Sequence, residues 1–209
     1  MARRETLRRY LVFTLGVLVS ATGIAFVTRA GLGTSPVSSI PFVLSLITPV
    51  SMGVYTFSFN MIFLLGESIL IRRFTLRQLL QIPATIFFGF CIDTALSIIP
   101  TRYGGPWLDS AVYLVTGCVI MSLGIYLEVL ADVIMLPCEA FTRALSRQTG
   151  KQFGNVKVFV DSSLTVIAAV LALCSFGKLN GVREGTLIDA MLVGQLVKGW
   201  GWLHKRRKQ

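Results

Sequence analysis

Lys157 and Asp161 are oppositely charged residues that lie four positions apart within an apolar stretch of the 209-residue chain. This spacing places both side chains on one face of a helix, close enough to neutralise each other. A charge in an apolar segment is costly unless it is paired or hydrated, so such residues mark candidate sites. The pair is either a structural salt bridge or part of a site for a solute or a proton.

Charged residues near the ends of two other apolar stretches either bind an anion or pair with each other. Asp93 lies late in one stretch, and Arg183 and Glu184 directly precede another. The Arg183 guanidinium is a planar fork of donors that suits a carboxylate, a phosphate or a sulfur oxyanion. Alternatively, Arg183 and Glu184 pair with Asp93 or Asp189 and lock two segments together.

The segment 29–41 interrupts a long apolar run with glycine, hydroxyl and proline residues. Glycine gives backbone freedom, a hydroxyl can cap a helix, and proline suits the first helical turn, where no amide donor is needed. The residues in these roles are Gly31, Gly33, Thr34, Ser35 and Pro36. We therefore predict a short helix from Pro36 that cannot span a bilayer. Its start would offer free amides and a positive dipole end to a solute.

The same pattern recurs 101 positions later. This shift, without a gap, aligns identical residues at 16 and 117, 23 and 124, 24 and 125, 30 and 131, 36 and 137, 44 and 145, 45 and 146, 48 and 149, and 53 and 154. Four of these nine matches are glycine or proline, which constrain the backbone, so we infer an internal duplication. Pro137 then starts a second short helix, and Asn60 aligns with Asp161. Glu139 either belongs to a site or only complements the positive end of that helix.

Composition places the chain in the membrane. It is 54% hydrophobic and 14% charged, with a mean hydropathy of +0.71. Apolar segments of about 17 to 25 residues are long enough to span a bilayer. The segments of this kind are 10–27, 53–71, 79–99, 110–130, 156–176 and 186–203.

The basic residues predict the orientation. Six spans put both termini on one side, and 15 of the 20 Lys and Arg residues fall on that side. The positive-inside rule then makes both termini cytoplasmic. The net charge of +10 and the basic tail are thus explained by orientation and anionic lipid, and nucleic acid is not expected as a partner.

The expected fold is an all-α membrane protein in one membrane domain. Six transmembrane helices form two three-helix inverted repeats, 1–101 and 102–209, each with a proline-started re-entrant or half-helix. Gly16 and Gly23 in the first span, with Gly117 and Gly124 in the fourth, make stripes of small residues that let helices approach closely. We expect these two helices to form the central pair.

Three short motifs resemble the YczE/YitT-like family of small bacterial membrane proteins. They are 31–36 (Gly-Leu-Gly-Thr-Ser-Pro), 135–140 (Met-Leu-Pro-Cys-Glu-Ala) and 181–186 (Gly-Val-Arg-Glu-Gly-Thr), and the resemblance covers nearly the whole chain. It implies a multi-pass protein of the bacterial inner membrane and supplies no defined activity. The chain departs from these relatives at Cys138, where they often have glycine.

The leading hypothesis is a transporter or permease for a small polar or anionic solute. The predicted solute-binding residues are Gly31, Gly33, Thr34, Ser35, Pro36, Asn60, Asp93, Pro137, Glu139, Lys157, Asp161, Arg183 and Glu184. A non-transporting membrane scaffold, or the substrate-binding subunit of a multi-component importer, is the alternative. Besides the lipid bilayer and the solute, the partners left open are a second copy in a homodimer and an energising protein.

An enzyme is not expected. The chain has no nucleophile next to a base and no phosphate-binding loop, and its one histidine lies in the basic tail. Its four cysteines lack the spacing of metal ligands, so neither a metal nor another cofactor is predicted.

Overall fold

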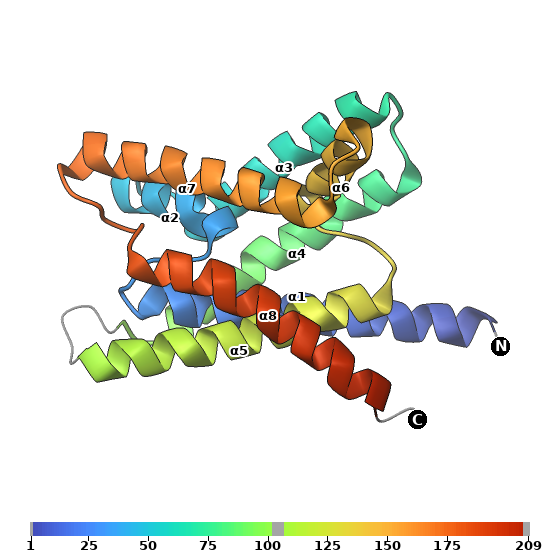
Figure 1. Ribbon diagram of the computed structural model, residues 1–209, viewed down its shortest axis with the longest axis horizontal. Helices are drawn as coiled ribbons and strands as arrows, with labels where there is room; N and C mark the ends of the chain where they lie inside the picture. The colour runs from blue at the N-terminus through green and yellow to red at the C-terminus, as the bar shows by residue number, and fades with distance from the viewer. Residues whose placement is uncertain (1, 102–106, 207–209) are drawn as a thin grey trace.

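The computed structural model describes residues 2–101 and 107–206, and these residues form eight α-helices and no strand (Figure 1). The helices are α1 (Ala2–Arg29), α2 (Pro36–Ile47), α3 (Met52–Ile71), α4 (Leu76–Ile98), α5 (Trp107–Ala131), α6 (Pro137–Thr149), α7 (Phe153–Phe176) and α8 (Glu184–Arg206). The predicted all-α class is confirmed.

Five of these helices are long and apolar enough to cross a membrane. They are the stretch Arg4–Arg29 of α1, and α3, α4, α5 and α7. Helix α8 has 23 residues but is outside this group. Asp189, Lys198 and its basic C-terminal end interrupt the apolar sequence of this helix. The prediction of six spans is therefore confirmed for five helices.

The two short helices begin where the sequence predicts. Pro36 opens α2, which has 12 residues, and Pro137 opens α6, which has 13. At about 1.5 Å per residue, neither reaches across a hydrocarbon core of about 30 Å. Figure 1 places α2 toward one end of the bundle and α6 toward the other.

Capping residues set the ends of α3 and α4. Ser51 accepts a hydrogen bond from the Val54 amide and starts α3, and Thr75 and Gln78 form a capping box that starts α4. Arg72 ends α3 in the left-handed conformation with φ 54°. The short connection makes α3 and α4 an antiparallel pair that packs along its length.

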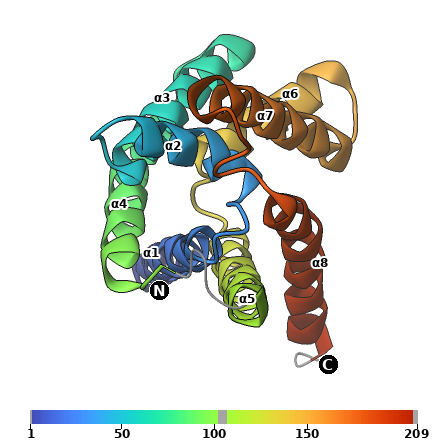
Figure 2. The ribbon, with the colours of Figure 1, turned by 90° about the vertical axis from the view of Figure 1, so that its left-hand side faces the viewer.

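The helices are arranged around the contact between α1 and α5 (Figure 2). Helix α4 packs against α1, and α8 packs against α5. On the other side of the molecule, α2 packs against α7, and α6 packs against α3. Each short helix therefore contacts a long helix from the other half of the chain.

Glycines allow the close approach of α1 and α5. A Cβ atom on Gly23 would lie 2.4 Å from the Met121 amide nitrogen, and one on Gly124 would lie 2.3 Å from the Ser20 amide nitrogen. Since real Cβ atoms do not come this close to backbone, only glycine fits at either position. The predicted close packing of these two helices is confirmed.

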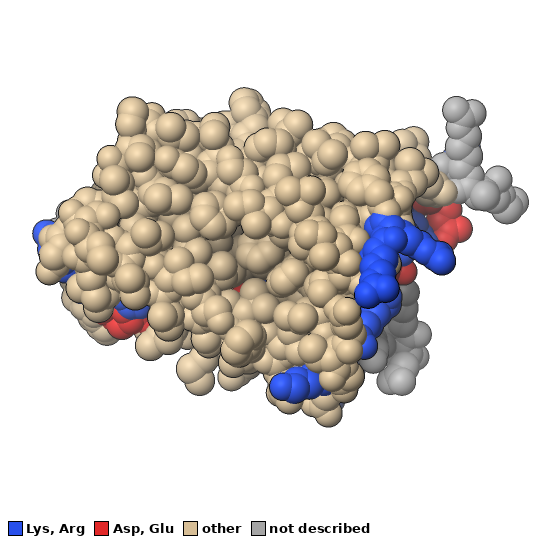
Figure 3. Space-filling view, turned by 90° about the horizontal axis from the view of Figure 1, so that it is seen from above, with Lys and Arg blue, Asp and Glu red and all other residues tan. Residues whose placement is uncertain are grey.

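Both termini lie at one end of the molecule, on the right in Figure 1. In Figure 3, Lys, Arg, Asp and Glu gather at the two ends, and the broad middle is nearly free of charge. Large apolar side chains cover the long helices, with Ile69 75% and Val158 67% exposed. Such a surface suits lipid. The common end of the termini agrees with the predicted topology, and its cytoplasmic placement stays a prediction.

Candidate functional site

The glycine segment after α1 contacts the start of α8. The Gly185 amide donates to the Leu32 carbonyl at 2.8 Å, and Arg183 Nη1 donates to the Gly31 carbonyl at 3.3 Å. Arg183 Nη2 also pairs with Glu184 at 3.2 Å. The predicted ion-pair lock between the third and sixth spans is therefore not formed by Arg183. Arg183 holds the backbone of segment 30–35, and it forms no ion pair with Asp93 or Asp189.

Buried hydroxyls surround the start of α2. Thr34 is fully buried, and its Oγ1 lies 2.7 Å from Thr28 Oγ1. Ser35 occupies the N-cap position, as predicted, but its side chain makes no capping bond. The Ser35 and Thr186 hydroxyls are buried without a hydrogen-bond partner. The glycines keep the predicted role of backbone freedom, since φ is 75° at Gly31 and 116° at Gly33.

The Lys157–Asp161 pair forms within α7. The Nζ and Oδ1 atoms are 2.9 Å apart, and the side chains are 26% and 19% exposed. At the aligned position in α3, Asn60 is buried and donates to the Thr56 carbonyl of its own helix. The ion pair therefore lies within α7, and the hydrogen bond of Asn60 lies within α3.

The start of α6 lies near this pair. Pro137 and Cys138 are buried, and Glu139 is half-buried in the first helical turn. Cys138 is within electrostatic range of Lys157 and Asp161. A carboxylate in the first turn complements the helix dipole, which agrees with the simpler reading of Glu139.

Asp93 caps α3 from the neighbouring helix. Its Oδ1 accepts the Gly53 amide at 2.7 Å and its Oδ2 accepts the Ser51 hydroxyl at 2.6 Å. Gly53 must be glycine here, because a Cβ atom would lie 2.2 Å from the Gly89 carbonyl oxygen. Asp93 therefore joins α4 to the positive end of α3.

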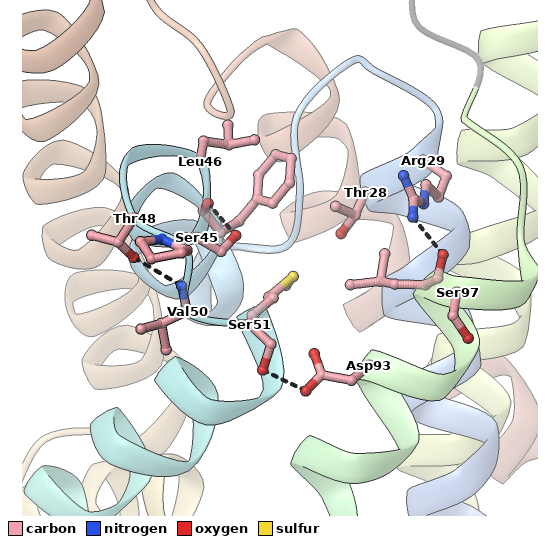
Figure 4. A pocket seen from close by; sticks show the side chains of 13 residues that line it. Thr28, Arg29, Ser45, Leu46, Thr48, Val50, Ser51, Asp93 and Ser97 are labelled. Atoms are coloured by element: carbon pink, nitrogen blue, oxygen red, sulfur yellow. Dashed lines mark hydrogen bonds between the residues drawn. The ribbon is translucent and has the colours of Figure 1, made fainter.

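Asp93 also lines a cavity of about 550 Å³ between α1, α2, α3 and α4 (Figure 4). The cavity lies at the end away from the termini, beside the last turn of α1. Its lining is partly polar and contains Thr28, Arg29, Ser45, Thr48, Ser51 and Ser97. Arg29, which is not among the predicted site residues, forms part of its wall.

A second cavity, of about 640 Å³, lies where α6 leads into α7. It is lined by Leu145, Thr149, Lys151, Asn155, Val156 and Phe159. Thr149 aligns with Thr48 of the first cavity under the shift of 101 positions. None of the predicted site residues lines this second cavity.

The predicted site residues thus fall in separate places. Segment 31–36 meets Arg183 and Glu184, Asp93 lines the first cavity, and Lys157 and Asp161 lie in α7 near the start of α6. Of the four charged residues Asp93, Lys157, Asp161 and Arg183, only Asp93 lines either of these two cavities.

Glu128 and Asp189 are buried carboxylates that are not among the predicted site residues. Glu128 accepts the Ser20 hydroxyl at 2.7 Å within the crossing of α1 and α5. Asp189 is 1% exposed and accepts from the Cys118 thiol at 3.4 Å. A partner 71 or 108 positions away carries no local sequence signal. The sequence shows only that an acidic residue lies within an apolar span, where it needs a partner.

Comparison with known proteins finds one relative and one family, and neither has a described function. The chain is 26% identical over 193 residues to the uncharacterized protein YyaS of Bacillus subtilis (strain 168), and the match covers 90% of each chain. No solved structure matches it. The resemblance to the YczE/YitT-like family stays a prediction. Residues 7–201 match the family of unknown function DUF6198, and the chain therefore belongs to this family.

Proposed function

We propose that this membrane protein is a permease for a small polar or anionic solute, built from two inverted three-span repeats. The repeats are residues 1–101 and 102–209, with α8 as the sixth span. The resemblance to the YczE/YitT-like family implies the bacterial inner membrane, and the positive-inside rule predicts both termini in the cytoplasm.

The contacts between α1 and α5 carry this proposal. Gly23 meets Met121, and Gly124 meets Ser20. Under the shift of 101 positions, residue 23 corresponds to residue 124 and residue 121 corresponds to residue 20, so the two contacts are equivalent. Reciprocal contacts of this kind are the mark of a two-fold axis between equivalent elements.

A second reciprocal pair supports the same axis. The Cβ position of Gly16 lies 2.9 Å from the Gly124 carbonyl oxygen, and that of Gly117 lies 3.0 Å from the Gly23 carbonyl oxygen. The helix contacts show the same symmetry when each helix is exchanged for its counterpart in the other half. The contact of α2 with α7 corresponds to that of α6 with α3, and the contact of α4 with α1 corresponds to that of α8 with α5. The exception is the contact between α3 and α4, which has no equally extensive counterpart between α7 and α8 in the described part of the chain.

Inverted repeats with broken or short helices are a transporter architecture. A two-fold axis in the membrane plane turns α2 and α6 toward opposite faces, and each short helix leaves room for water beyond its end. The two cavities, at the ends of α2 and α6, agree with this arrangement.

A membrane scaffold is the second candidate, and one observation favours it. The residues Thr34, Ser35 and Pro36 are buried, and the segment before them is bonded to the start of α8. Such packing serves a structural role as well as a solute site.

A ligand screen followed by transport measurement separates these candidates. Purified protein is heated with small carboxylates, phosphates, sulfonates and neutral polyols, because a ligand that binds only the folded state raises the melting temperature. Each stabilising solute is then tested for uptake by proteoliposomes, with protein-free liposomes as the control. Stabilisation with uptake supports the permease. Stabilisation without uptake indicates a binding subunit, and no stabilisation by any class favours the scaffold.

A further inference from the structure

Arg29 lies in the last turn of α1 and lines the cavity between α1, α2, α3 and α4 (Figure 4). One of its terminal nitrogens donates to the Leu96 carbonyl of α4. Its Nε atom is buried and makes no hydrogen bond. In the described part of the chain Arg29 forms no ion pair, although the cavity wall also contains a carboxylate.

That carboxylate, Asp93, is already engaged. Each of its oxygens accepts a hydrogen bond, from the Gly53 amide and from the Ser51 hydroxyl, at the start of α3. The positive end of the α3 dipole further compensates its charge. Arg29 is thus left as the cationic group of the cavity with donor capacity to spare.

The remaining polar side chains of the cavity wall are uncharged hydroxyl residues. Ser45, Thr48 and Ser97 place hydroxyl groups around the same space. A volume of about 550 Å³ falls within the usual range of ligand pockets, about 300 to 1,000 Å³. Guanidinium groups bind planar oxyanions with paired hydrogen bonds.

We propose that this cavity binds a small oxyanion, with the Arg29 guanidinium as its receptor and the hydroxyls of Ser45, Thr48 and Ser97 around the rest of the solute. This inference rests on the proposed permease function and names its substrate class and one of its binding sites. The site is distinct from the predicted residues at the starts of α2 and α6.

Thiol labelling tests the site without knowledge of the natural solute. Ser97 is exposed, lines the cavity and follows Leu96, so Ser97→Cys places a thiol near Arg29. Cys174 is the exposed native cysteine and is changed to Ser, since Cys91, Cys118 and Cys138 are buried. The rates of reaction with an anionic sulfonate-bearing and a cationic trimethylammonium-bearing methanethiosulfonate are then compared.

The positive charge of Arg29 should raise the labelling rate of the anionic reagent. We expect the ratio of anionic to cationic rate to be at least about fivefold higher with Arg29 than in the Arg29→Gln background, because opposite charges attract even in hydrated space. The Arg29→Lys variant keeps the charge and should keep most of the preference. Small carboxylates should slow the labelling when Arg29 is present and not when it is Gln.

Several results would overturn the inference. They are no labelling of Ser97→Cys by either reagent, an equal rate ratio in the Arg29 and Arg29→Gln proteins, or loss of the preference in Arg29→Lys with unchanged melting. Uptake of a solute with no charge preference at position 97 would reject this site and leave the permease intact. A preference that depends on Arg29, together with no uptake of any oxyanion, would keep the site and reject the permease.

Discussion

Lys157 and Asp161 are the charged pair of α7, a helix that is long and apolar enough to cross a membrane. Their spacing predicted an ion pair on one helical face, and the pair forms at 2.9 Å. The partner of Arg183 was predicted wrongly, because the carbonyl of Gly31 lies 152 positions away and has no distinctive side chain. Arg29 was missed for the same reason, since its contact with α4 arises only when the helices pack.

The ion pair makes a prediction at this scale. Removing one partner strands the other charge, so Lys157→Met and Asp161→Leu should each destabilise the protein by about 3 kcal/mol. The double variant should recover the yield and the melting temperature of the parent. We expect the double variant to fold but to lose uptake. The reason is that Asn60, which aligns with Asp161 under the shift of 101 positions, gives the first repeat a polar group at the corresponding position, and a purely local salt bridge would not require one there. Normal uptake by a stable double variant would assign the pair to structure alone.

At the scale of the helices, backbone-controlling residues were the most informative part of the sequence. Proline predicted the starts of α2 and α6, and the glycine stripes predicted the packing of α1 on α5. Apolar length predicted six spans, and five of them are helices long and apolar enough to cross a membrane. Helix α8 is outside this group, and Asp189 and Lys198 lie within it. Asp189 accepts a hydrogen bond from Cys118 of α5, a contact that the sequence does not reveal.

The α1–α5 crossing predicts a matched pair of effects. Gly23→Ala and Gly124→Ala each force a methyl group into the backbone of the other helix and should destabilise the protein by about 1–3 kcal/mol or more. The two losses should be similar if the positions are equivalent. Thermal melting in detergent measures both.

Gly194→Ala is the control for this crossing. Gly194 lies in α8, and a Cβ atom there would have nothing within 4 Å. Alanine is the better helix former by about 1 kcal/mol, so this variant should melt at the same or a higher temperature. If Gly194→Ala destabilised as much as Gly23→Ala, the loss would reflect glycine in general and not the crossing.

At the scale of the molecule, the shift of 101 positions connects sequence and structure. The aligned glycines predicted a duplication, and their reciprocal contacts support a two-fold arrangement of the halves. The cavities could not be predicted, since each is bounded by segments from several places in the chain. We therefore propose that the two halves are equivalent and that their cavities open to opposite sides of the membrane.

Thr48 and Thr149 test this claim most directly, because they align under the shift and line different cavities. Each is changed to Cys in the Cys174→Ser background and exposed to a membrane-impermeant thiol reagent in right-side-out and inside-out vesicles. As controls, Lys178→Cys after α7 reports the predicted outer side, and Arg147→Cys in the last turn of α6 reports the predicted inner side. We predict that Thr48→Cys reacts from the outside and Thr149→Cys from the inside. Reaction of both from the same side would contradict the inverted arrangement.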